Sequence, residues 1–170
     1  YLNSGTYTLT NLEYANISQD SITLRSATGN RDDVILQGPG MDDGGNGHGV
    51  YVNGDNVTIA DLTIRDVAKH GITVQPGSDN FLAHNIRIVD TGEQLIKVSG
   101  DETTTPKNDG VIQCSLLEYT TTLDDGDDGY YTNGIDMLNA HNWIIRDNII
   151  KNIKHNPGIT SQLAGPAILA

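Results

Sequence analysis

The chain has 170 residues, a formal net charge of −12, and 19 glycines but a single phenylalanine. This length suffices for one domain with a buried core and is too short for two ordinary domains. The glycines, together with many Asn, Asp and Thr residues, are typical of a turn-rich β protein rather than a helical one. The acidic balance argues against a nucleic-acid partner, because that binding requires Lys and Arg to neutralise phosphates. It suits calcium binding or simple solubility instead.

Cysteine usage and hydropathy give no sign of a disulfide or a membrane span. The single cysteine, Cys114, cannot form an intramolecular disulfide. No apolar run approaches the ~20 residues that cross a bilayer. The chain begins at Tyr1, without an initiator methionine, and stops at Ala170 inside a predicted strand. We therefore expect either a processed product or a fragment of a longer protein.

The first 49 residues are predicted to form an irregular first coil followed by a loop. Residues 5–10 alternate polar and apolar side chains as a half-buried strand does, and short apolar runs at 21–25 and 33–36 predict two further strands. The glycine-rich stretch 38–49 is predicted to be a surface loop. It leads to a strand at 50–52, which we expect to stack on the strand at 72–74.

From residue 50 onward the chain repeats itself. Residues 56–66 match residues 80–90 position for position at an offset of 24, and two looser copies begin at 111 and 143. Each copy ends in a second short strand, at 72–74, 95–98, 134–138 and 167–169. A repeat of this length indicates a solenoid in which every copy forms one coil. Two insertions, at 99–109 and 120–132, lengthen the third coil, and such insertions often build a binding face.

Aligned copies predict which way the side chains point. Two apolar columns are expected to fill the core; they are Ile59, Ala83, Ile112 and Ile145, and Ile64, Ile88, Leu117 and Ile150. Between them lies a corner column of Asp61, Asn85, Cys114 and Asp147, in which Asp and Asn tolerate left-handed backbone. A second corner is predicted at Asp66, Asp90 and Asn152, with Tyr119 as its exception. Cys114 is expected to be a partly buried substitute, and Trp143 a packing residue.

Short strands, Asn/Asp corners and coil-sized spacing together resemble the right-handed parallel β-helix superfamily of pectate-lyase-like proteins. The residues that carry the resemblance include 90–97, 133–136 and 141–148, and it covers roughly residues 20–170. It implies an all-β fold, a single right-handed parallel β-helix domain of about six coils. No active-site motif accompanies it, so the fold transfers and the activity does not.

The second strands predict an outward ladder of Tyr51, Thr73, Lys97 and Asp136, because their neighbours fill the inward positions. Parallel strands stack about 4.8 Å apart, so such a ladder spans several sugar-sized steps. It suits polysaccharide binding, and an ordinary solvated sheet face has the same pattern. His70, Glu93 and Asn133 precede three of these strands and are expected to line one edge.

Two chemistries fit these residues. In β-elimination of an acidic sugar, Lys97 or His70 serves as base, Tyr51 or His70 as acid, and calcium, Arg65 or Arg87 neutralises the carboxylate. In hydrolysis, Glu93 and Asp136 form the carboxylate pair. Tyr51, Thr73, Arg65 and Asn133 are the candidate substrate-binding residues.

The strongest metal candidate is the acidic loop containing Asp124, Asp125, Asp127 and Asp128, with glycines that allow it to bend. Four carboxylates in five positions suit Ca²⁺, which prefers oxygen ligands, although the pattern is not an EF-hand and a solvated acidic loop is the simpler explanation. The five histidines show no close metal-ligand spacing.

These observations support two functional hypotheses. The first is an extracellular or cell-envelope protein that binds an acidic polysaccharide along the outward ladder. A stronger version of this hypothesis adds cleavage of the bound polysaccharide. The second is a structural protein. Strand edges left unpaired at the end of a solenoid favour end-to-end association with other copies into a filament, spike or adhesin.

Overall fold

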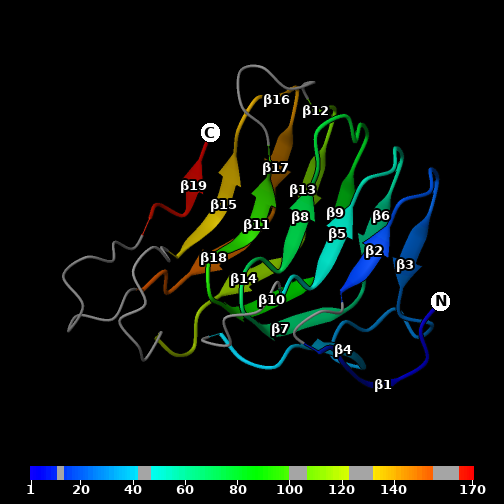
Figure 1. Ribbon diagram of the computed structural model, residues 1–170, viewed down its shortest axis with the longest axis vertical. Coiled ribbons are helices and arrows are strands. Elements are labelled where there is room, and N and C mark those ends of the chain that lie inside the picture. The colour runs from blue at the N-terminus through cyan, green and yellow to red at the C-terminus, as the bar shows by residue number, and fades with distance from the viewer. Residues whose placement is uncertain (11–13, 42–46, 100–106, 123–131, 155–164) are drawn as a thin grey trace.

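In the computed structural model, which describes residues 1–10, 14–41, 47–99, 107–122, 132–154 and 165–170, all regular secondary structure is β. Every strand pairing in this part of the chain is parallel. Three large sheets and one two-stranded sheet result, and Figure 1 shows the chain colours running in the same direction across the large sheets. Within the described residues no helix is long and apolar enough to cross a membrane.

Each large sheet collects one strand from every turn of the chain. The first sheet contains β1 (Gly5–Thr8), β4 (Val34–Gln37), β7 (Thr63–Val67), β10 (Arg87–Thr91), β14 (Leu116–Glu118) and β18 (Ile149–Lys151). The second contains β2 (Ala15–Ile17), β5 (Val50–Val52), β8 (Ile72–Val74), β11 (Gln94–Val98), β15 (Asn133–Met137) and β19 (Ile168–Leu169). The third contains β3 (Thr23–Arg25), β6 (Thr58–Ala60), β9 (Leu82–His84), β13 (Val111–Gln113) and β17 (Ile144–Arg146). A small separate sheet pairs β12 (Lys107–Asn108) with β16 (Ala140–His141).

The chain visits the three sheets in turn and pairs each strand with the strand one coil earlier, which is the arrangement of a β-solenoid. The expected all-β architecture with parallel stacking is therefore confirmed. The expected pairing of residues 50–52 with residues 72–74 is confirmed as well. The strands near the N-terminus stack in the same way, since β1, β2 and β3 pair with β4, β5 and β6.

Both predicted apolar columns contribute to the core, and Ile145 and Ile150 of the fourth copy are partly buried against it. Ile59 pairs with Ala83, which pairs with Ile112, and Ile64 pairs with Ile88. All five of these side chains are fully buried. Continuous aliphatic columns therefore join successive coils, and their burial is the main favourable term that holds the stack together.

Left-handed residues turn the chain at the corners between sheets. In the first predicted corner column, φ is 52° at Asp61, 50° at Asn85 and 56° at Cys114. The second column, Asp66, Asp90 and Asn152, also has positive φ, and a third column that sequence reasoning did not predict contains Asn56, Asn80, Asp109 and Asn142. Asp and Asn are enriched there because their short polar side chains tolerate this conformation.

Two corner predictions have different outcomes. Cys114 was expected to be partly buried, but its side chain is exposed, whereas Asp61 in the same corner column is 4% exposed. Trp143 packs as expected: it contacts the core beside Phe81, with ring centroids 6.1 Å apart, and its ring covers Gly110.

Candidate active site on the second sheet

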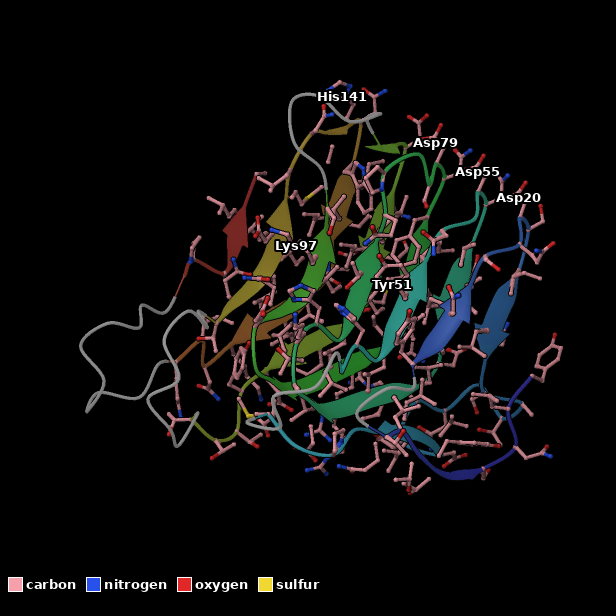
Figure 2. All side chains as sticks on the ribbon, in the orientation of Figure 1. Asp20, Tyr51, Asp55, Asp79, Lys97 and His141 are labelled. Atoms are coloured by element: carbon pink, nitrogen blue, oxygen red, sulfur yellow. The ribbon has the colours of Figure 1, made fainter. Side chains whose placement is uncertain are left out.

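The predicted ladder forms on the outer face of the second sheet. Tyr51 pairs with Thr73, Thr73 with Lys97, and Lys97 with Asp136. Figure 2 labels Tyr51 and Lys97 on this sheet, in β5 and β11, with β8 between them. The ladder is not an open strip, because Thr73 and Asp136 are each only 1% exposed. Only part of Tyr51 and Lys97 reaches solvent.

An ion pair occupies one end of the ladder. The Lys97 ammonium contacts Oδ2 of Asp136, and their side chains are 17% and 1% exposed. The sequence hypothesis that Lys97 is a base conflicts with this contact, because an ammonium that donates to a carboxylate has no lone pair to accept a proton. The two charges of the pair balance, and the ammonium is its more exposed half, so an anionic group at the outer face would meet Lys97 before Asp136.

Four aromatic rings gather at the other end. His48 stands between Tyr51 and His70, with ring centroids 5.4 Å and 5.1 Å away, and Tyr14 packs against both His48 and Tyr51. Nδ1 of His48 is 3.0 Å from the Thr73 hydroxyl. The rings therefore form a continuous aromatic surface at the Tyr51 end of the ladder, and His48 covers Thr73.

Both histidines of this cluster are neutral at ordinary pH. Burial, together with the positive charge of Lys69, lowers the pKa of His48 to about 4. Burial lowers the pKa of His70 to about 3, assisted by His48, Lys97 and Lys69. A neutral imidazole keeps one nitrogen lone pair and is able to act as a base.

His70 is held by Glu93. Nε2 of His70 lies 3.4 Å from Oε2 of Glu93, and the lowered pKa of His70 makes this a contact between a neutral ring and the carboxyl group. A ring proton on Nε2 faces this carboxyl group, and Nδ1 on the other side of the ring is buried with no hydrogen-bond partner. Burial raises the pKa of Glu93, while Lys69 and Lys97 oppose the rise.

Asn133 extends the site by one coil. It pairs with Gln94 at the start of β11. Its side chain is 0% exposed, and neither its Oδ1 nor its Nδ2 has a hydrogen-bond partner. Sequence reasoning placed Asn133 and Glu93 along one edge. In the register Asn133 pairs with Gln94, so Glu93 lies one residue earlier, where its amide donates to the Lys69 carbonyl. A buried amide without partners is costly unless something fills its hydrogen bonds.

Arg65 lies apart from these residues. It belongs to β7 in the first sheet, where Nε donates to Asp66 at 2.7 Å. Arg87 is in the same sheet and pairs with Glu118. The predicted role of Arg65 in binding a substrate carboxylate at the ladder is therefore not supported by its position.

Sequence reasoning missed three members of the cluster, Tyr14, His48 and Lys69. A signal for His48 was present, since His48-Gly49-Val50 repeats His70-Gly71-Ile72 at the start of adjacent strands of the second sheet. Tyr14 and Lys69 lie outside the strands, and no repeat marks them. Only the stacked coils bring them to the ladder.

The predicted calcium ligands Asp124, Asp125, Asp127 and Asp128 lie outside the described residues. Among the residues that the structure does describe, no group of three or more His, Cys, Asp or Glu side chains is arranged to hold a metal ion. The proposal of Ca²⁺ at the acidic loop therefore stays a prediction.

Comparison of the chain with protein-family models, with curated proteins and with solved structures gave no match. The resemblance to pectate-lyase-like proteins therefore depends on the repeat pattern, and the parallel sheets are compatible with it. The function has to be argued from the site itself.

Proposed function

We propose that this protein binds an acidic polysaccharide at the outer face of its second sheet and cleaves it by β-elimination. The observation that carries the proposal is the pair of neutral imidazoles, His48 and His70, which lie between the ring of Tyr51 and the carboxylate of Glu93. Ionisable groups with strongly shifted pKa values that gather with a specific partner mark functional sites. The aromatic surface of Tyr14 and Tyr51 adjoins this group and suits stacking against a sugar ring.

Each part of the elimination has a residue in this cluster. His48, whose ring is half-buried and stands between Tyr51 and His70, takes the proton from C5 of a uronate, since Nδ1 of His70 is buried. The electron pair forms the C4–C5 double bond, and the C4–O bond breaks. The Tyr51 hydroxyl gives its proton to the leaving oxygen, since burial and the neighbouring Tyr14 raise the pKa of Tyr51 and keep the hydroxyl protonated. The Lys97 ammonium attracts the uronate carboxylate and stabilises the charge that develops on it. Proton exchange with water restores both groups.

The same geometry favours elimination over hydrolysis. Hydrolysis by Glu93 and Asp136 needs one carboxylate free to act on the sugar or on water. Asp136 is instead engaged with Lys97 and is 1% exposed. The groups that remain available for proton transfer are imidazoles and a phenol, which suit removal of a C5 proton.

The direct test is to mix the protein with pectate, alginate and glycosaminoglycans and to follow the ultraviolet absorbance of unsaturated uronic ends. We expect product from at least one polymer and a loss of about 100-fold or more in His48→Ala, since a general base contributes that much. Arg146→Ala, on the outer face of the third sheet, is the control expected to keep activity. Absence of product with every polymer would overturn the elimination.

The wider setting follows from the same proposal. We propose that the coil is right-handed, because parallel crossover connections are right-handed in about 98% of cases. We also propose that the chain belongs to the pectate-lyase-like superfamily. A protein that acts on such a polymer works outside the cell or in the cell envelope. Fractionation of the source organism and an experimental structure test these points separately.

A second candidate, end-to-end association of copies, is favoured by one surface. The last described coil exposes apolar side chains, with Ile149 60% exposed, Ile144 52% and Ile168 42%. These lie in β18, β17 and β19, each of which has one neighbour in its sheet. Sedimentation over a concentration series tests this candidate: association that Ile149→Asp reduces supports it, and a monomer at all concentrations refutes it.

A further inference from the structure

Tyr119 interrupts the corner pattern of the first sheet. The register places it between Asp90 and Asn152, both of which have positive φ, whereas Tyr119 does not. Its ring is instead 0% exposed and belongs to the hydrophobic core. This coil has therefore replaced a corner residue with a side chain that reaches through the interior.

The Tyr119 hydroxyl ends at the backbone of Glu93. It donates to the Glu93 carbonyl, and it lies 2.9 Å from the hydroxyl of Thr91, which also contacts that carbonyl at 2.9 Å. Thr91 is likewise 0% exposed. The two hydroxyl protons satisfy one carbonyl oxygen inside the core, where a missing partner would be costly.

Glu93 is thus held on both sides of its backbone. Its amide donates to the Lys69 carbonyl at 3.0 Å, and its carbonyl receives Tyr119 and Thr91. With the backbone held, the side chain reaches Nε2 of His70. We propose that Tyr119, together with Thr91, is a positioning residue that fixes Glu93 against His70 through the core. Its catalytic meaning rests on the function proposed above.

A packing role alone does not explain the hydroxyl. Phenylalanine fills the same space, and burial of a phenol oxygen costs free energy unless it is hydrogen-bonded. Burial also raises the pKa of Tyr119 well above its usual range, which keeps the hydroxyl protonated as a donor. The described partners of the Tyr119 oxygen are Thr91 and Glu93, so the hydrogen bonds that offset its burial are those that hold the Glu93 backbone.

The test is Tyr119→Phe, which keeps the ring and removes the donor. We expect the pKa of Glu93, followed by NMR of a ¹³C-labelled carboxyl, to fall by about 0.5 or more as the side chain gains access to water. We also expect the Nε2 proton of His70 to exchange with solvent about tenfold faster. The matched control is Ser78→Ala, which removes another buried hydroxyl that donates to a backbone carbonyl, that of Val52 at 3.3 Å.

Unchanged values for Glu93 and His70 in a folded Tyr119→Phe protein would overturn the inference. If that variant does not fold, Thr91→Val decides by the same two measurements, and Thr91→Ser should restore the wild-type values. These readouts do not need substrate, so they stand even if no polymer is cleaved and the proposed function fails. If the polymer is cleaved, Tyr119→Phe should lower kcat more than it changes KM and should shift the pH profile.

Discussion

Stability should depend on pH through His70, and the size of the effect follows from its environment. Burial, with His48, Lys97 and Lys69 nearby, lowers the pKa of His70 from 6.5 to about 3, while Glu93 lies at its Nε2. Between those two values the unfolded chain binds a proton that the folded chain does not. The free energy of unfolding therefore falls as the pH falls through this window, by about 1.4 kcal/mol per pH unit.

From pH 7 to pH 5 the His70 contribution amounts to about 2 kcal/mol, because only the part of this interval below 6.5 counts fully. Urea unfolding at both pH values measures it as the difference between wild type and His70→Gln, which cannot take up the proton. We expect the wild type to lose about 2 kcal/mol more than the variant. His141→Gln, at an exposed position, is the control and should behave as the wild type. Equal losses in wild type and His70→Gln would refute the reasoning.

Three further predictions concern packing and the acidic loop. Gly92→Ala should destabilise the fold by more than about 2 kcal/mol in urea unfolding, because its new Cβ would lie 2.1 Å from the Ala68 carbonyl oxygen; an unchanged midpoint would contradict this. Ile88→Ala should cost about 2 to 5 kcal/mol by the same assay and the exposed Ile149→Ala much less, so equal costs would argue against the stacked core. If Asp124–Asp128 binds Ca²⁺, a chelator should lower the melting temperature, and an unchanged melt would remove that site.

The parts of the fold that repeat were predictable. Ile64 and Ile88 recur at an offset of 24 residues, and Asp61 and Asn85 recur at a corner, so a period and a side-chain pattern sufficed to place them. The structure confirms their pairing and their left-handed backbone. The exposure of Cys114 was not predictable in this way. An aligned column predicts where a residue lies along the coil, but it does not predict how far its side chain is buried.

The site was predicted only in outline. The ladder from Tyr51 to Asp136 followed from alternation within strands, but its burial did not, because coverage depends on residues outside the repeat. His48 comes from a glycine-rich segment whose composition indicated only a loop. The roles of Lys97 and Arg65 also changed, since which charges meet depends on the sheet to which each strand belongs.

By itself the sequence determined the architecture: a repeat of short apolar strands and Asn/Asp corners can bury its apolar faces only by stacking coil on coil. The tertiary structure decided which polar groups meet between coils. Lys97 meets Asp136, His70 meets Glu93, and Tyr119 reaches the Glu93 carbonyl from the next coil through the core. The physical reason is that core burial is periodic and additive along the chain, whereas hydrogen bonds and ion pairs require individual atoms to lie within a few ångströms of each other.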